Sequence, residues 1–294
     1  MAREITVAAV QTRHGWDAED NIRRVLAMAE RAADAGAGLV LPSELFETPY
    51  FCKTPDPRHR ALARPAEGHP VIARFAEFAA RRGVVVPVSF YERAGEALYN
   101  SVAVIDADGS LLGIYRKCHI PAFEAYHEDA FFAPSPEGPK VWQTRIGRLG
   151  VGICWDQWFP ELARAMALMG AELIVYPTAI GSETFDPGWD SAGQWQAVMR
   201  GHAAANLVPV LAANRIGRET DDGVTLEFYG CSFAADHRAR MVAEAPRGEE
   251  ALLLSRLDLD AAARDRKQWG TFQTRQPQHY AAVVSVPAGP PPAG

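Results

Sequence analysis

The stretch LGVGICWDQWFPELARAMALMGAELIVYP, residues 149–177, decides the fold class. Its first part is an apolar run that is typical of a buried strand and ends at Cys154. Pro160 suits the first turn of a helix, which is expected to continue to Met169. The run ELIVYP, residues 172–177, then indicates a second strand. Strand, helix and strand in this order predict an α/β protein with Cys154 at a strand-to-helix turn.

The same alternation extends over the rest of the chain. ITVAAV, residues 5–10, predicts a strand, and Asp17 is placed to cap a helix with apolar residues at positions 22, 25, 26 and 29. Further helices are predicted around residues 71–82, around 194–206 and near Ala261. NSVAVIDADGSLLGIYRK, residues 100–117, has the pattern of a β-hairpin. Hairpins among helical crossovers favour a layered α/β sandwich with mixed sheets over a purely parallel fold.

Composition excludes several classes of partner. The chain has 294 residues and a net charge of −6, and its Lys and Arg residues are scattered, which argues against nucleic acid or an anionic membrane as a partner. No window approaches the 18 apolar residues of a membrane span, and no secretory signal is visible. The four cysteines lie far apart without a CxxC pair, so reduced thiols in a cytoplasmic protein are expected. We expect one domain over residues 1–286 and a flexible Pro/Gly-rich tail over 287–294.

Three predicted strand ends carry residues that could do chemistry. Glu44 follows the apolar run LVLP, Lys117 ends the second strand of the predicted hairpin, and Cys154 ends the strand described above. Active groups of α/β folds gather at such strand ends. Each residue also has an ordinary interpretation, as an exposed loop acid, a solvated lysine or a small buried hydrophobe. Glu47 is a second acid in the first of these loops.

Together the three side chains supply the parts of a cysteine hydrolase: a base, an oxyanion donor and a nucleophile. Cys118 and His119 are neighbours without a second Cys/His pair at ligand spacing, so no metal site is predicted. No histidine is placed to act as the base, so a Cys-His enzyme is unsupported.

These residues resemble a known family. Glu44 in PSELFETPYF, Lys117 in YRKCHIP and Cys154 in GICWDQWFPE are similar to the Glu-Lys-Cys triad of the nitrilase (carbon–nitrogen hydrolase) superfamily. The similarity runs from VAAVQT near the start to WGTFQTRQP near the end. Within the superfamily, the stretch GICWDQWFPELARAMALMGAELIVYPTAIGSE, residues 152–183, resembles the branch that acts on N-carbamoylputrescine.

The resemblance implies a four-layer αββα sandwich that forms homo-oligomers, a dimer or larger. It implies a cysteine-dependent amidohydrolase that cleaves the carbamoyl C–N bond of N-carbamoylputrescine to give putrescine, ammonia and CO2. No metal or organic cofactor is expected, and the partner is a small-molecule substrate. Glu128 in AYHEDAFF matches a second glutamate of the family, expected to hold Lys117 and tune the thiol.

A diamine-derived substrate carries an ammonium group, so the pocket is expected to offer an acid far from Cys154. Glu183 is the candidate for this acid, and Tyr50 and Trp155 are candidates to line the aliphatic part. The loop AFEAYHE, residues 122–128, departs from the Gly-containing stretch of the branch, which leaves the substrate less certain than the chemistry.

Three alternatives stay open. A related Glu-Lys-Cys hydrolase acting on a ureido acid such as β-ureidopropionate, or on a simple aliphatic amide, is the nearest; a ureido acid would need a cation in the distal pocket. The others are a thiol-based redox or metal-binding protein and a non-catalytic scaffold. The former would need a partner for Cys154, and the latter fits poorly with an intact triad.

Overall fold

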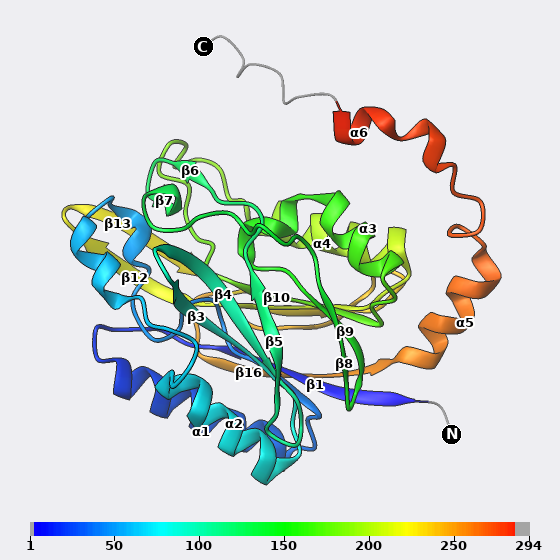
Figure 1. Cartoon of the computed structure of the whole chain (residues 1–294), viewed down its shortest axis with the longest axis horizontal. Helices are drawn as coiled ribbons and strands as arrows, with labels where there is room; N and C mark the ends of the chain where they lie inside the picture. Colours follow the sequence, from blue (N-terminus) through cyan, green and yellow to red (C-terminus); the bar gives the residue numbers. More distant parts are fainter. Residues whose placement is uncertain (1–2, 286–294) are drawn as a thin grey trace.

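The computed structural model describes residues 3–285 and contains two large β-layers between two pairs of helices (Figure 1). The first layer has the order β16-β1-β2 and continues, through the bridge between Leu39 and Val85, into β3-β4-β5. Its strands are β1 (Glu4–Gln11), β2 (Leu39–Leu41), β3 (Val86–Ala94), β4 (Ala97–Ile105), β5 (Leu111–Arg116) and β16 (Ala251–Asp258).

The second layer has the order β15-β14-β11-β10-β9-β8. Its strands are β8 (Val141–Thr144), β9 (Gly147–Val151), β10 (Leu173–Thr178), β11 (Val210–Asn214), β14 (Phe233–Ala235) and β15 (Met241–Glu244). Two hairpins complete the strands: β6 (Ala122–Phe123) with β7 (Tyr126–His127), and β12 (Ile216–Asp221) with β13 (Val224–Tyr229). Both large layers combine parallel and antiparallel pairs, so the predicted mixed sheets are confirmed.

Six α-helices lie within the described residues: α1 (Ala18–Asp34), α2 (Pro70–Arg82), α3 (Pro160–Leu168), α4 (Ala192–Asn206), α5 (Leu259–Trp269) and α6 (Ala281–Ser285). Figure 1 shows α1 and α2 on one side of the strands and α3 and α4 on the other. Five short 3-10 segments connect these elements: Phe51–Lys53, Pro57–Leu62, Glu128–Ala130, Cys154–Trp158 and Pro277–His279.

Alternating side chains explain the four layers. In β1, Val7 and Ala9 belong to the core between the two sheets, whereas Ala8 and Val10 pack with the apolar faces of α1 and α2. Successive residues of a strand point to opposite faces, so an apolar run covers a sheet on both sides. The strand β10 repeats the pattern between the central core and the helices α3 and α4. The expected αββα sandwich is therefore confirmed.

Local sequence signals account for most element boundaries. The side chain of Asp17 accepts the Asp20 N–H and caps α1, as predicted. Pro160 opens α3, and the helices predicted around 71–82 and 194–206 are α2 and α4. The hairpin β12–β13 was not predicted from the sequence. Its turn at Asp222 and Gly223, both with positive φ, is the signal that could have revealed it.

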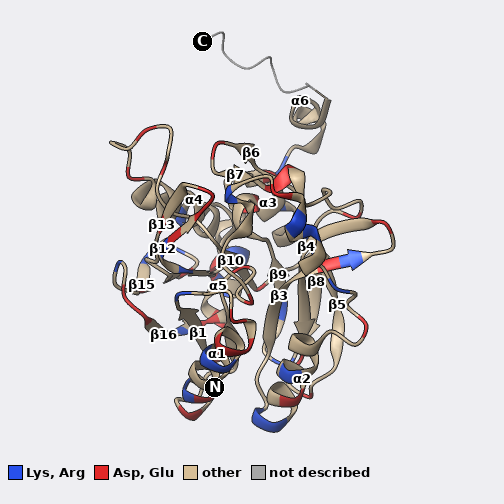
Figure 2. Cartoon of the chain, turned by 90° about the vertical axis from the view of Figure 1, so that its left-hand side faces the viewer, with Lys and Arg blue, Asp and Glu red and all other residues tan. Residues whose placement is uncertain are grey.

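Basic and acidic residues are interspersed over the elements seen in Figure 2. Within residues 3–285, none of the helices combines the length and apolarity needed to cross a bilayer. The tail predicted over residues 287–294 lies outside the described residues, and the single domain stays a prediction.

Candidate active site

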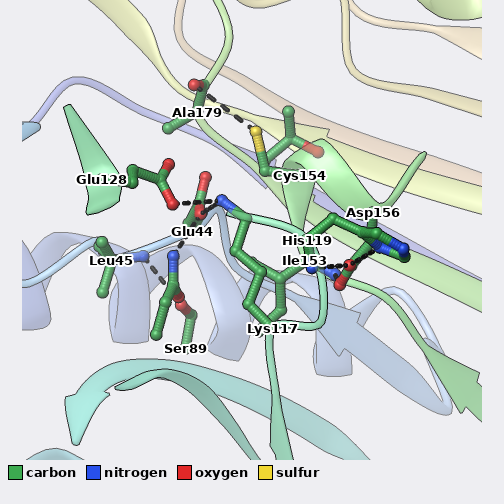
Figure 3. A network of polar contacts seen from close by, with 12 residues as sticks. Glu44, Leu45, Ser89, Lys117, His119, Glu128, Ile153, Cys154, Asp156 and Ala179 are labelled. Atoms are coloured by element: carbon green, nitrogen blue, oxygen red, sulfur yellow. Dashed lines mark hydrogen bonds and ion pairs between the residues drawn. The ribbon is translucent and has the colours of Figure 1, made fainter. Parts of the chain in front are cut away.

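Three strand ends bring the predicted catalytic side chains into one buried cluster. Glu44 lies shortly after β2, Lys117 directly follows β5, and Cys154 lies three residues beyond the end of β9. Glu44 and Lys117 are completely buried, and Cys154 is 5% exposed. Figure 3 shows the three side chains together with Glu128 from the 3-10 turn after β7.

Lys117 is held between two carboxylates. Its Nζ lies 3.0 Å from Oε1 of Glu44 and 2.6 Å from Oε2 of Glu128 (Figure 3). Burial opposes a charge on Lys117, but the nearby Glu128 and Glu44 outweigh burial and raise the pKa of the ammonium well above its ordinary value. Lys117 thus keeps its charge near neutral pH, and a fixed cation of this kind suits the stabilisation of a developing oxyanion.

The two oxygens of Glu44 differ in their contacts. Oε1 accepts hydrogen bonds from Lys117 and from Asn100 Nδ2, the latter at 2.6 Å. Oε2 is buried and has no hydrogen-bond partner among the described residues. A carboxylate with one anchored and one uncommitted oxygen is suited to take a proton from a nearby group.

The backbone that carries Glu44 is also fixed. Nη2 of Arg215, a completely buried side chain, donates to the carbonyls of Glu44 and Leu45 at 2.7 and 3.0 Å. The Leu45 N–H donates to Oγ of Ser89 at 2.9 Å, and Leu45 has a φ of +46°. Because an apolar residue rarely adopts this φ, these contacts stabilise a turn that aims Glu44 into the cluster.

Cys154 occupies a strained position. Its φ is +42°, in the left-handed region, and its Sγ lies 3.7 Å from the carbonyl oxygen of Ala179. Burial, followed by the charge of Glu44, raises the pKa of the thiol well above its ordinary value, although Lys117 opposes this shift. The surroundings of Cys154 therefore favour the neutral thiol. Attack therefore needs a base, and Glu44 is the carboxylate with the larger effect on the pKa of the thiol, ahead of Glu128.

A cavity of about 520 Å³ opens onto Cys154. Trp155 and Glu183 line it, as predicted for the substrate-binding side chains. Tyr50 is not among the lining residues; it is completely buried, and its hydroxyl donates to Oε1 of Glu128 at 2.8 Å. The structure thus brings the catalytic candidates together with two of the three binding candidates and places Tyr50 behind Glu128.

The comparison with known proteins decides the family. The sequence profile of the carbon–nitrogen hydrolases matches residues 6–267. This chain belongs to the carbon–nitrogen hydrolase family. The resemblance to the nitrilase superfamily is confirmed, and the protein is an enzyme that hydrolyses C–N bonds.

Two relatives and one solved structure illustrate the similarity. The chain is 46% identical to an N-carbamoylputrescine amidase of Arabidopsis thaliana, over 97% of this chain and 96% of that protein. It is 45% identical to a citrullinase of Francisella tularensis, over 95% of this chain and 98% of that protein. The crystal structure of a carbon–nitrogen hydrolase from Helicobacter pylori G27 superposes with a TM-score of 0.90 at 32% identity, covering 97% of this chain and all of that one.

The wall of the cavity in this carbon–nitrogen hydrolase is largely aromatic. The lining side chains not predicted from the sequence include Phe123, Trp158, Phe185 and Trp189. Phe123 lies in the β6–β7 hairpin, the loop where the sequence departs from its branch, and its ring centroid is 5.2 Å from that of Trp155. The departure therefore adds an apolar wall beside the nucleophile.

Glu183 is the acid on the cavity wall that lies far along the chain from the triad. It is 8% exposed, and burial raises the pKa of its carboxyl above the ordinary value, against the effect of Ser191. Among the described residues that line the cavity, there is no Lys, Arg or His. A buried carboxylate such as that of Glu183 is stabilised in its charged form when a ligand places a cationic group beside it.

Replacing Glu128 with glutamine is expected to stabilise the fold at alkaline pH. Burial raises the pKa of Glu128 from 4.5 to about 7, although Lys117 opposes the shift. Between these values the folded chain binds more protons than the unfolded chain, so wild-type stability falls as the pH rises. Glutamine cannot ionise, so the Glu128→Gln variant should gain unfolding free energy relative to wild type as the pH rises above the ordinary pKa of a glutamate.

Urea unfolding from pH 4.5 to pH 8 measures this effect. The advantage of Glu128→Gln should grow with pH and be close to zero near pH 4.5. Glu96→Gln, a change at an exposed acid, is the control and should show no such trend. A pH-independent difference between Glu128→Gln and wild type would contradict the assignment of a raised pKa to Glu128.

Proposed function

We propose that the enzyme hydrolyses N-carbamoylputrescine to putrescine, ammonia and CO2, with Cys154, Glu44, Lys117 and Glu128 as its catalytic residues. The observation that carries this choice is the cavity wall: the buried carboxylate of Glu183 has no cationic side chain beside it on the described wall, which favours a substrate with an ammonium group. The 46% identity with a plant N-carbamoylputrescine amidase supports the same substrate.

The chemistry begins with transfer of the Cys154 proton to the uncommitted oxygen of Glu44. The sulfur attacks the carbamoyl carbon, and the developing oxyanion is stabilised by the Lys117 ammonium and by the N–H of Trp155. This N–H lies in the first turn of the 3-10 segment Cys154–Trp158, where backbone donors lack helical partners. Glu44 then protonates the departing nitrogen, and a water molecule that it activates hydrolyses the carbamoyl-enzyme. This step restores the Cys154 thiol and releases a carbamic acid, which breaks down to CO2 and the second amine and so completes the product set.

Other groups hold these side chains in place. Asn100 and Lys117 both donate hydrogen bonds to Oε1 of Glu44. Its second oxygen, Oε2, is therefore left to accept and return the proton. Tyr50 donates to Oε1 of Glu128, and Lys117 donates to Oε2. Glu128 is thus the second carboxylate, after Glu44, that binds Lys117. In this proposal Tyr50 acts through Glu128, while Trp155 packs against the aliphatic part of the substrate.

A citrulline hydrolase is the second candidate, because one relative at 45% identity is a citrullinase. Citrulline carries a carboxylate as well as an ammonium group, and a ureido acid carries a carboxylate alone. Either substrate would gain from a lysine or arginine in the distal pocket, and the described lining offers neither.

Substrate turnover separates these candidates. We expect kcat/KM for N-carbamoylputrescine to exceed that for citrulline and for N-carbamoyl-β-alanine, measured as ammonia release. Glu183→Gln should lower kcat/KM for N-carbamoylputrescine by roughly 10- to 100-fold, mainly through KM, because it removes the buried partner of the ammonium. Glu124→Gln removes an exposed acid from the same cavity and should change it by less than about threefold. A preference for N-carbamoyl-β-alanine would refute both the substrate and the role of Glu183.

A homo-oligomer and a cytoplasmic location belong to the same proposal. Exposed apolar side chains on the described C-terminal segment, including Trp269, Val283 and Val284, support association of copies. All four cysteines are unpaired, which supports a reducing compartment.

A further inference from the structure

Asp156 is a buried carboxylate that the mechanism above does not use. It is completely buried, and no Lys or Arg among the described residues forms an ion pair with it. It lies two residues after Cys154, in the same 3-10 turn, but it does not line the cavity. A charge in this position is stable only if donors surround it, and four donors do.

Both oxygens of Asp156 are fully engaged (Figure 3). Oδ1 accepts from the backbone N–H of His119 at 3.0 Å and contacts the Nδ1 atom of the same residue at 2.7 Å. Oδ2 accepts from the backbone N–H of Ile153 at 2.9 Å and from the hydroxyl of Tyr115 at 2.7 Å. Two backbone and two side-chain contacts fix the carboxylate in one orientation.

The donors come from the two segments that carry the proposed nucleophile and cation. Ile153 directly precedes Cys154, whereas Tyr115 and His119 lie two residues before and two residues after Lys117. One carboxylate therefore connects the Cys154 turn to both sides of Lys117. The ring of His119 also stacks on Phe159 at 3.6 Å between centroids, which adds a second contact between the same segments.

We infer that Asp156 is a positioning residue that fixes the Cys154 sulfur relative to the Lys117 ammonium. Cys154 has a φ of +42°, so its turn needs contacts that hold it in this conformation, and the bond to the Ile153 N–H provides one directly before it. A displacement of about 1 Å between reacting groups can cost about 100-fold in rate. Asp156 should thus act on kcat and leave KM nearly unchanged, since it does not line the cavity. The inference rests on the proposed roles of Cys154 and Lys117, but not on which ureido compound is the substrate.

The test replaces Asp156 with asparagine, which has the same shape but presents an N–H₂ group where Oδ1 or Oδ2 now accepts. The new N–H₂ group then faces the two donors that bind that oxygen in the wild type, so the turn that carries Cys154 should shift. Steady-state kinetics use whichever compound of the ureido and amide panel the wild type hydrolyses best. The fraction of folded enzyme is taken from the urea-unfolding transition of each variant. We expect Asp156→Asn to lower kcat per folded enzyme by roughly 10- to 100-fold, with KM within about threefold of wild type.

Two further variants make the result decisive. Glu92→Gln changes another buried carboxylate, which contacts Ser101 and Arg116 beside Lys117, and should reduce thermal stability with kcat per folded enzyme unchanged. Tyr115→Phe removes only one donor and should lower kcat by about three- to tenfold; it decides the question if Asp156→Asn does not fold. An unchanged kcat per folded enzyme in Asp156→Asn, or in Tyr115→Phe where the former is insoluble, would overturn the inference. A wild type inactive on the whole panel would overturn the proposed function, and the inference with it.

Discussion

Replacing Cys154 with alanine is expected to reduce kcat by roughly 10⁴-fold or more for every substrate of the enzyme. In the proposed mechanism the sulfur forms the covalent intermediate, and the described residues that line the cavity include no Ser, Thr or second Cys. Cys154→Ser should be almost as inactive, because Glu44 is a weak base for a hydroxyl group. Ammonia release from N-carbamoylputrescine, measured at high enzyme concentration, checks both variants.

Cys231 provides a closely matched control for this experiment. It is also buried, and its φ is +55°, so it shares the backbone conformation of Cys154, but it does not line the cavity. Cys231→Ala should retain turnover within about threefold of wild type. Residual activity of Cys154→Ala above a few per cent would rule out Cys154 as the nucleophile.

The same pair of cysteines tests the backbone strain at the nucleophile. Alanine is strained at positive φ, whereas glycine is not. We expect the unfolding free energy of Cys154→Gly to be about 1 kcal/mol higher than that of Cys154→Ala. At Cys231, the glycine variant should likewise be more stable than the alanine variant. If glycine were the less stable replacement at Cys154, the left-handed turn would not be a source of strain there.

The fold was largely predictable because its signals are local. The cap at Asp17, the proline that opens α3 and the apolar runs of β1 and β10 each lie within a few residues of the element that they define. The clustering of Glu44, Lys117 and Cys154 was predictable for another reason: these three side chains follow strand ends, and their surrounding motifs resemble one family.

The partners of the triad were not predictable from the sequence, since they depend on contacts between distant segments. Asn100 binds Glu44 across 56 positions, and Tyr50 binds Glu128 across 78. Nothing in the run NSVAVIDADG, which begins with Asn100, or in the motif ETPYF, which contains Tyr50, indicates these contacts. Tyr50 was a candidate to line the aliphatic part of the substrate, whereas its hydroxyl is directed to a carboxylate in the structure.

Substitutions in the cluster of Glu44, Lys117 and Glu128 should affect stability and activity differently, because of the charge that the cluster carries. Lys117 contacts both Glu44 and Glu128, and all three side chains are buried, so the fully ionised cluster carries a net negative charge. A buried ion pair that loses one member leaves an uncompensated charge, which typically costs 3–5 kcal/mol, as an order of magnitude. In the proposed mechanism the lysine therefore has two functions: it holds the cluster together and it binds the oxyanion.

Replacing Lys117 with methionine should accordingly lower the unfolding free energy by about 3–5 kcal/mol at pH 8 and reduce kcat by at least about 10²-fold. Adding Glu128→Gln removes one of the two carboxylates left facing each other, so the double variant should recover part of the lost stability and none of the activity.

Lys53→Met is the matched control, because Lys53 is also buried and pairs with Glu219 outside the cavity lining. It should lose stability yet keep most of its turnover per folded molecule. Urea unfolding and ammonia release on the four proteins test this separation. If the double variant were less stable than Lys117→Met, the charge of Glu128 would not be what destabilises the fold of Lys117→Met. If the double variant recovered activity, Lys117 would be excluded as the oxyanion donor.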